Sequence, residues 1–408
     1  MGVILCLIPV ALLTGPFIPD AIISIISILF ITITIKERLW DRYFYNKYFI
    51  FIFIFYLYFL FASFASENII LSLEASFFYF RFIIFALAVW FLLDSDKNLI
   101  KKFTIYFLIT FCIAITDGYY QYYFENNIFG FENSSEDRMT LTFNSKLILG
   151  GYLSRLLPLL FALVIYNFSK NKKIIIFLFS LIILIDCLVF LSGERTAIGI
   201  LSLFTIMVLL LVSKFKLLRL ITISISITFI VFIALSNTAT MDRNVYYTLN
   251  QISPKSDDTN IPTFFSLNHQ SLAIASINMY KDNKYIGAGP KQFRVLCDKY
   301  VNQNSNQFCS THPHNSYLQL LAETGIVGVL FTIIPFIFLI YIFIKHMINK
   351  LFKSKSSLSD YQLCLLICIF LSLWPILPTQ NFFNNWINII YYLPIGFFLH
   401  SIYLRKTD

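Results

Sequence analysis

The residues best suited to acid–base chemistry lie in one stretch, THPHNSYLQLLAETGIVG, at residues 311–328. It contains His312 and His314, two of only five histidines in the chain, and it leads into a long apolar run. Asn315 or Ser316 is a good N-cap, so we expect a helix to begin there. The positive end of a helix attracts anions and disfavours imidazolium. We therefore expect a neutral His314 that accepts a proton beside an anion site. The alternative is that these side chains only cap the helix.

The cationic side chains suited to an anionic substrate are arginines at the ends of apolar segments. Arg195 lies in LSGERTAIG (191–199), between two such segments, and Arg81 and Arg155 have similar places. Arginine binds phosphate oxygens in bidentate fashion, and ionisable groups at membrane depth usually face a cavity. We predict that these guanidinium groups surround one pocket, although an arginine at a helix end also commonly extends to the interface.

Two of the seven cysteines lie in the polar stretch before the histidines. Cys297 and Cys309 are twelve residues apart, in a segment predicted below to be extracytoplasmic, where a disulfide persists. We predict a bridge between them, which restrains the approach to the histidines. The other cysteines fall in apolar segments, where we expect them to be packing residues.

The elements that must position these side chains are membrane helices. Hydrophobic residues make up 58% of the 408 residues, and charged residues only 13%, against roughly 25% in a soluble protein. Apolar stretches long enough to span a bilayer recur along the chain. We predict an all-α integral membrane protein with about twelve transmembrane helices. The predicted spans are 2–15, 17–35, 48–63, 77–94, 103–120, 147–167, 174–191, 196–213, 217–235, 317–344, 360–377 and 384–403.

Alternate connections between these spans carry most of the lysines and arginines, as cytoplasmic loops do. Examples are KERLWDRYFYNK (36–47), KHMINKLFKSK (345–355) and the RK of the tail (405–406). Both termini are then cytoplasmic, and the net charge of +9 needs no nucleic-acid partner. The predicted parts are an N-terminal bundle of about nine helices (1–235), one large periplasmic loop (236–313) and about three C-terminal helices with a short tail (314–408).

The predicted periplasmic loop contains local structural signals. SLAIASINMYKDN (271–283) has apolar residues at helical spacing, and the glycines and proline of YIGAGPKQF (285–293) predict a tight turn. Close helix packing through small residues explains Gly325 and Gly328 in the helix that follows. No group of His, Cys and carboxylate residues has metal-ligand spacing, so we predict no metal and no other cofactor.

This pattern resembles the O-antigen ligase family, whose superfamily also includes O-antigen polymerases and some protein O-oligosaccharyltransferases. The resemblance rests on HNS (314–316), followed after eight residues by Gly325 and Gly328, together with SGERTA and GAGPKQFR. It is strongest over residues 191–330, and the number of predicted helices fits along the whole chain.

The resemblance implies a GT-C-like membrane glycosyltransferase. Its donor would be a glycan on undecaprenyl diphosphate and its acceptor a lipid A–core sugar, at the periplasmic face of the bacterial inner membrane. It assigns His314 to the base or acceptor-positioning role and Arg195 to diphosphate binding. Family members often carry an arginine about eighteen residues before the glycine turn, where this chain has His269. Arg243 and Arg294 are other cations of the loop. The residues predicted to bind substrate are Asn315, Ser316, His312, His269, Arg294, Arg81 and Arg155.

Alternative functions remain open at this point. A polysaccharide polymerase uses the same donor with a second lipid-linked repeat as acceptor, and a protein O-oligosaccharyltransferase uses a protein; we favour the ligase. A polysaccharide transporter or flippase belongs to another class, because it binds a glycan without forming a bond. It predicts internal repeats and broken helices near the bilayer midplane, and the sequence shows no clear repeat.

Overall fold

The computed structural model describes residues 1–132, 139, 148–236, 238–252, 266–301, 308–352 and 358–404. These residues form helices and connecting segments, and they contain no β-strand beyond one isolated bridge between Asn126 and Glu132. The predicted all-helical fold is therefore confirmed for this part of the chain. The tail at 405–408, which carries the RK of the charge argument, lies outside the described residues.

Eight helices in the described ranges are long and apolar enough to cross a membrane, and each coincides with a predicted span. The chain is therefore a multi-pass membrane protein. These helices are α3 (Phe17–Glu37), α5 (Lys47–Phe64), α6, η2 and α7 taken together (Ile69–Ser95), α8 (Leu99–Phe124), α9 (Leu149–Phe168), α10 (Lys172–Leu191), α12 (Lys216–Ser236) and α17 (Ser316–Leu351).

The other four predicted spans fall on shorter or less apolar helices. The span predicted at 2–15 is divided into short helices, because Pro9 lies in the first turn of a new one that begins at Ile8, and Gly15 (φ 102°) ends the run. The helix predicted at 360–377 ends at Ser372, before two prolines that lack the N–H a helix needs. These helices are α1 (Gly2–Cys6), α2 (Ile8–Ala11), η1 (Leu12–Thr14), α11 (Arg195–Leu211), α18 (Asp360–Ser372) and α19 (Asn385–Tyr403).

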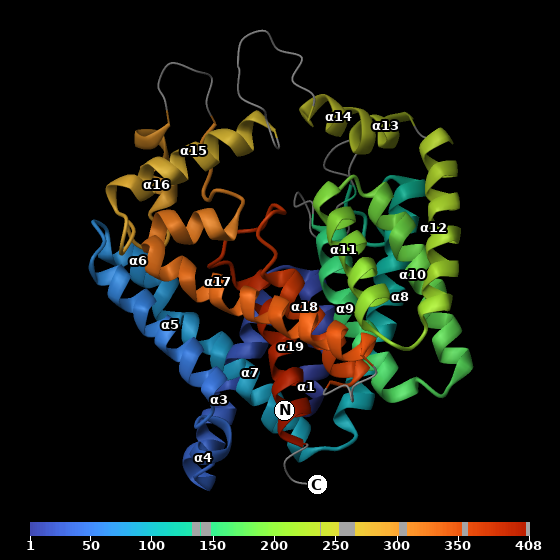
Figure 1. The fold of residues 1–408 in the computed structure, drawn as a ribbon, viewed down its shortest axis with the longest axis horizontal. Coiled ribbons are helices and arrows are strands. Elements are labelled where there is room, and N and C mark those ends of the chain that lie inside the picture. The colour runs from blue at the N-terminus through green and yellow to red at the C-terminus, as the bar shows by residue number, and fades with distance from the viewer. Residues whose placement is uncertain are drawn as a thin grey trace.

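The remaining described helices are short and lie outside the membrane-length ones. In Figure 1, α13 to α16 gather at one end of the bundle, and the N-terminus lies toward the other end. The helix predicted at 271–283 is confirmed as the larger part of α15. These elements are α4 (Trp40–Tyr43), α13 (Thr238–Met241), η4 (Asp242–Tyr246), α14 (Tyr247–Ile252), α15 (Leu267–Asp282) and α16 (Phe293–Tyr300).

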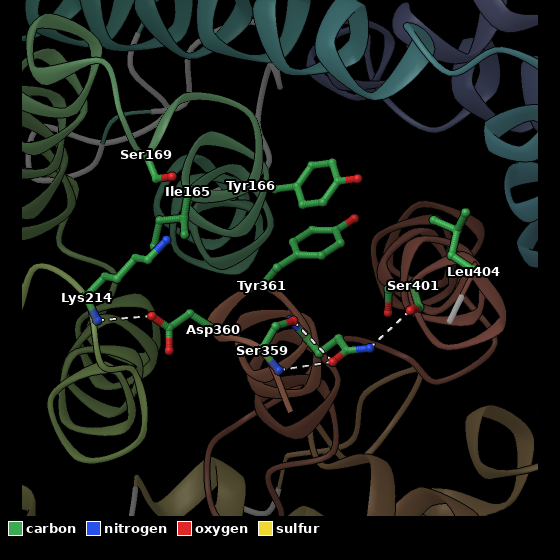
Figure 2. A pocket seen from close by; sticks show the side chains of 10 residues that line it. Ile165, Tyr166, Ser169, Lys214, Ser359, Asp360, Tyr361, Ser401 and Leu404 are labelled. Atoms are coloured by element: carbon green, nitrogen blue, oxygen red, sulfur yellow. Dashed lines mark hydrogen bonds between the residues drawn. The ribbon is translucent and has the colours of Figure 1, made fainter. Parts of the chain in front are cut away.

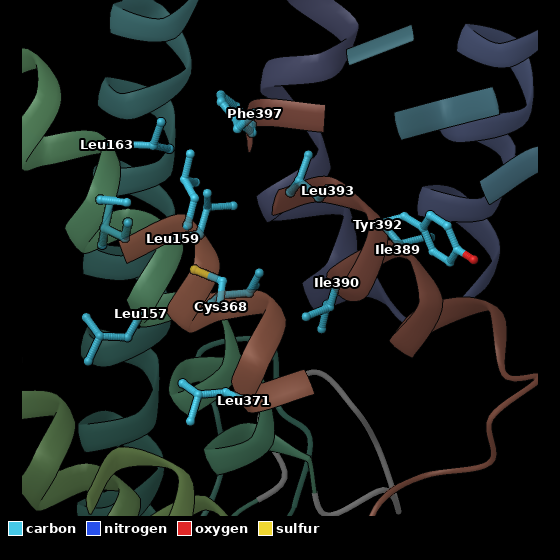
Figure 3. Close-up of a cluster of buried hydrophobic side chains, with 14 of the residues drawn as sticks. Leu157, Leu159, Leu163, Cys368, Leu371, Ile389, Ile390, Tyr392, Leu393 and Phe397 are labelled. Carbon is cyan, nitrogen blue, oxygen red and sulfur yellow. The ribbon is translucent and has the colours of Figure 1, made fainter. Parts of the chain in front are cut away.

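The central core lies where α9 and α18 pack together and where α7 packs against α19. Figure 3 shows Leu159, Cys368 and Leu393 among its buried side chains. Gly396 allows α19 to approach α7 closely, since a Cβ there would lie 2.6 Å from the Cβ of Val89. The core fixes the positions of α18 and α19, and thereby of the irregular segment between them. This segment contacts the stretch 311–328, which contains the two histidines.

Candidate active site

His314 lies immediately before the N-cap of α17. As predicted, Asn315 is that cap: its Oδ1 accepts hydrogen bonds from the N–H groups of Tyr317 and Leu318, at 2.9 and 3.1 Å. His314 itself has φ 55°, in the left-handed region. This region is uncommon for residues other than glycine, and residues held there cluster at functional sites. The chain therefore makes a strained turn at the histidine that the sequence singled out.

The segment between α18 and α19 holds this turn in place. The N–H of Thr379 donates to the carbonyl oxygen of His314 at 2.8 Å. The hydroxyls of Thr379 and Ser316 lie 2.8 Å apart, and Asn315 Nδ2 donates to the carbonyl of Pro375 at 2.7 Å. Asn315 and Ser316, which we predicted to bind substrate, thus have protein partners that fix the position of His314.

Three histidines meet at this turn. The ring centroids of His312 and His314 are 4.1 Å apart, and those of His269 and His314 are 5.7 Å apart. His269 lies in the first turn of α15, where its Nδ1 is 2.7 Å from the hydroxyl of the N-cap residue Ser266. The fold therefore brings His269, far away in sequence, to the pair in 311–328.

Arginines extend this cluster on both sides. The guanidinium of Arg195 is near enough to His269 for its charge to act on the imidazole, and Arg243 acts likewise on Arg195. At the opposite end, the charge of Arg294 acts on His312. We call the resulting series of groups the His–Arg strip. Its members are Arg243, Arg195, His269, His314, His312 and Arg294.

The electrostatics of the strip keep its histidines neutral. Burial lowers the pKa of His314, and His269 lowers it further. Burial and the charge of Arg195 lower the pKa of His269. Burial, His314 and Arg294 lower the pKa of His312 to about 3. A neutral imidazole can accept a proton, so the strip combines proton acceptors with the fixed positive charge of its arginines.

Glu194 fixes the turn that precedes Arg195. Its carboxylate oxygens accept hydrogen bonds from the N–H groups of Gly150 and Gly151, at 2.6 and 3.0 Å. These N–H groups belong to the first turn of α9, where a negative charge is stabilised by the helix dipole. The turn approaches α9 so closely that a Cβ at Gly150 would lie 2.9 Å from the hydroxyl of Ser192. Glu194 therefore joins the starts of α9 and α11.

Arg195 and Arg243 are held by contacts across this turn. Nη1 of Arg195 donates to the hydroxyl of Thr248 in α14 at 3.2 Å. Nε of Arg243 donates to the carbonyl of Gly193 at 3.0 Å. The two cations are thus positioned from η4 and α14, which follow α12, as well as from α11.

The structure places the other two predicted arginines in different surroundings. Arg81 forms an ion pair with Asp20, with Nε and Nη2 donating to its two carboxylate oxygens at 3.0 and 3.3 Å. Asn385 also donates to Asp20, at 3.2 Å, so this group joins α3, α7 and α19. Arg155 lies over the ring of Tyr391, 6.0 Å from its centroid. A substrate-binding role for Arg81 and Arg155 remains a prediction.

The turn at 285–293 packs against a break in α17. Gly325 has φ 64° and ψ −168°, which are not helical values. The N–H groups of Ala288 and Gly289 donate to the carbonyls of Ala322 and Glu323, at 3.0 and 2.8 Å. A Cβ at Gly325 would collide with the carbonyl of Tyr285. Gly325 therefore divides α17 in two, a role beyond the close packing that the sequence predicted.

Cys297 and Cys309 are joined in a disulfide with a Cα–Cα distance of 5.9 Å. The bond connects α16 to the segment that leads to His312. It closes a loop whose residues 302–307 lie outside the described part of the chain.

Sequence reasoning did not single out Glu323 or Gln319. Both side chains are fully buried next to the break in α17, with 0% exposure. The sequence did contain a signal for them: an acidic residue lies four positions after a glutamine within an otherwise apolar helix. A buried carboxylate needs partners, so this spacing indicates a buried polar pair.

A separate pocket of about 400 Å³ lies where α9 and α19 end and α18 begins. Figure 2 shows the rings of Tyr166 and Tyr361 side by side, and the main-chain N–H of Lys214 donating to Asp360. None of the predicted site residues lines this pocket. This pocket therefore does not belong to the His–Arg strip.

Comparison with known families supports the resemblance of the sequence. Residues 179–333 match the family described as O-antigen ligase. The match includes every member of the His–Arg strip and the break at Gly325, whereas Arg81 and Arg155 lie outside it. No curated protein matches the chain.

The match bears on the class of the protein. O-antigen ligases and the related polymerases are membrane glycosyltransferases with lipid-linked glycan substrates. The membrane helices agree with such a class. The match and the helices together support a likeness to the ligase and polymerase superfamily of membrane glycosyltransferases.

Proposed function

We propose that the protein is an O-antigen ligase-like transferase that moves a glycan from undecaprenyl diphosphate to a lipid A–core acceptor. The observation that supports this most directly is the His–Arg strip. It combines a half-buried neutral histidine at a strained turn, His314, with several cations. Transfer from a lipid diphosphate needs both a base for the acceptor hydroxyl and positive charge for the leaving group.

In this mechanism, His314 accepts the proton of the acceptor hydroxyl as its oxygen attacks the anomeric carbon of the donor sugar. The bond between that carbon and the diphosphate oxygen breaks, and lipid diphosphate leaves with the electron pair. Arg195 stabilises the charge that develops on the leaving group, with His269 beside it, and Arg294 adds positive charge from the opposite end of the strip. The imidazolium then returns its proton to the diphosphate or to water. The chain's own residues supply this chemistry, without a metal.

An apolar groove of about 370 Å³ between α5, α17, α18 and α19 supports a lipid-linked donor. Phe331, Leu366 and Ile395 are among its lining residues. One end is formed by Leu373, Phe382 and other residues near the segment that binds His314. We propose that the hydrocarbon chain of the donor occupies this groove, with its diphosphate at the strip.

We also propose that the strip faces the periplasm and that both termini are cytoplasmic. The shorter helices α11, α18 and α19 and the divided first segment then complete about twelve crossings. Reporter fusions at the C-terminus and after Ser236 test this orientation. Cytoplasmic activity of the fusion after Ser236 would contradict it.

The decisive experiment is transfer in vitro by the purified protein, given undecaprenyl-diphosphate-linked glycan and either lipid A–core or a second lipid-linked repeat as acceptor. Product on lipid A–core supports the ligase. Product only on the lipid-linked repeat identifies a polymerase, and transfer to protein alone identifies an oligosaccharyltransferase. Binding of the donor with no transfer to any acceptor favours a transporter. An inactive His314→Asn variant is the control for contaminating transferases.

A further inference from the structure

Glu323 is a carboxylate that the chemistry above does not use. It lies two residues before the break in α17, and it is fully buried. A buried ionisable group is retained only where hydrogen bonds or opposite charges compensate its desolvation. The contacts of Glu323 therefore indicate which segments of the protein it holds in position.

Both carboxylate oxygens have partners. Oε1 accepts the N–H of Phe293, the first residue of α16, at 3.1 Å. Oε2 accepts Nε2 of Gln319, one helical turn earlier, at 3.0 Å. The main-chain carbonyl of Glu323 accepts the N–H of Gly289 at 2.8 Å. One residue thus binds the 285–293 turn at its middle, through Gly289, and at its end, through Phe293.

Helix α16 carries Arg294 directly after the residue that Glu323 binds. Arg294 is near enough to Glu323 for its positive charge to act on the carboxyl group. Arg294 also acts on His312, and the disulfide of Cys297 restrains the same helix. The position of this end of the His–Arg strip therefore depends on the Glu323 carboxylate.

Gln319 extends the same network to the opposite wall. Its Nε2 also lies 3.1 Å from Oδ1 of Asn381, and its Oε1 accepts the N–H of Phe382 at 2.8 Å. Both residues belong to the segment between α18 and α19, where Thr379 binds the carbonyl of His314. Gln319 is fully buried as well.

We propose that Glu323 and Gln319 form a buried positioning pair that sets Arg294 and His314 at a fixed separation. Neither residue touches substrate; the pair acts through the two walls that it joins. This inference rests on the proposed function, in which Arg294 contacts the lipid diphosphate and His314 the acceptor hydroxyl.

The first test changes the pair and measures kcat and KM for the lipid-linked donor. In Glu323→Gln, the amide has only one acceptor oxygen, so either the N–H of Phe293 or Nε2 of Gln319 faces an N–H₂ group instead of an acceptor. We expect kcat/KM to fall about 10- to 100-fold, as when residues that orient a site are lost. Gln319→Glu places two carboxylates together and should have a similar effect. The double exchange, Gln319→Glu with Glu323→Gln, restores one amide and one carboxylate and should recover most of the activity.

A double-mutant cycle separates positioning from general stability. In an Arg294→Ala background, Glu323→Gln should lower kcat/KM less than about threefold, because the group that it positions is gone. Full additivity of the two losses would overturn the proposal. Glu74→Gln is the matched control: Glu74 pairs with Lys291 of the same turn at 3.2 Å, but its side chain is 66% exposed. Such a pair contributes little, and this variant should keep wild-type kinetics.

A distance measurement tests the pair without catalysis. Spin labels at Val295→Cys in α16 and Ile376→Cys in the segment between α18 and α19 report on the two walls, since both positions are exposed. The background has its five free cysteines replaced. We expect a single narrow distance distribution, broadened by Glu323→Gln and narrowed again by the double exchange. An unchanged distribution in Glu323→Gln would contradict positioning, whether or not the wild type transfers glycan. If the wild-type protein transferred no glycan but the distance distribution still broadened in Glu323→Gln, the proposed function would be contradicted and the positioning pair would not.

Discussion

The two sides of the His–Arg strip are constructed differently. The histidine side consists of α15, α16 and the first half of α17, and main-chain hydrogen bonds, a disulfide and buried polar side chains hold it together. The arginine side consists of α9 to α14, and side-chain contacts such as that of Arg195 with Thr248 hold its cations. A base must lie within hydrogen-bonding reach of one proton, whereas charge acts over longer distances. The base therefore needs the more rigid side of the strip, whereas the cations can act from the side that is held less rigidly.

Replacing His314 should have the largest effect. Asparagine tolerates the left-handed backbone better than most residues, so His314→Asn removes the base while it retains the turn. We expect kcat to fall about 10²- to 10⁴-fold, with an unchanged circular dichroism spectrum and melting temperature. If transfer persisted at the wild-type rate, the role of the histidine side would be wrong.

Changes at Arg195 should follow in size. We expect Arg195→Ala to lower kcat/KM for the donor about 10- to 100-fold, and Arg195→Lys to restore only part of it, because lysine lacks the bidentate fork. Steady-state kinetics at two ionic strengths measure this. Full activity of the lysine variant would mean that Arg195 contributes charge alone.

Substitution at the break in α17 tests how rigid the histidine side must be. Gly325→Ala adds a Cβ to a positive-φ residue and drives it into Tyr285. We expect a loss of about 1–3 kcal/mol in stability, seen as a lower melting temperature, together with reduced transfer. Gly130→Ala is the control, since Gly130 also has positive φ (84°) but no heavy atom within 4 Å of the added Cβ. Equal losses in the two variants would show that packing at Gly325 is unimportant.

The pH dependence should give the smallest and most specific effect. Burial and His269 lower the pKa of His314 below its ordinary value of 6.5. A base acts when neutral, so kcat/KM should remain high as the pH falls to 6.5 and decline only below it. Removing the charge of Arg195 raises the pKa of His269, and because a charged His269 lowers the pKa of His314, the decline should then move to lower pH. An acid limb centred above 6.5 in the wild type would contradict the environment described for His314.

Much of the fold could be predicted from the sequence because membrane helices follow from apolar length alone. The cap at Asn315 and the turn at 285–293 were predictable too, since local residue chemistry determines them. The break at Gly325 was not, because it depends on contact with Tyr285, distant in sequence. A glycine inside an apolar run gives the same pattern whether it packs or breaks a helix.

The site was partly predictable for a similar reason. His314 and Arg195 stand in local motifs, whereas His269 becomes a neighbour of His314 only through the docking of α15. Arg81 shows the converse. Its place at a helix end suggested a pocket, yet the guanidinium forms an ion pair with Asp20, which is far away in the chain. Sequence spacing identifies charged residues but not which opposite charge each one meets.

The divided α17 also has a mechanical consequence. The second half of this helix, after Gly325, belongs to the membrane-length part, which tilts and shifts as bilayer thickness varies. A continuous rod would transmit that tilt to the residues at its start. Because the backbone is broken at Gly325, and the first half is bound to the 285–293 turn and the segment before α19, we expect such tilting to reach the proposed site less than it would through a continuous helix.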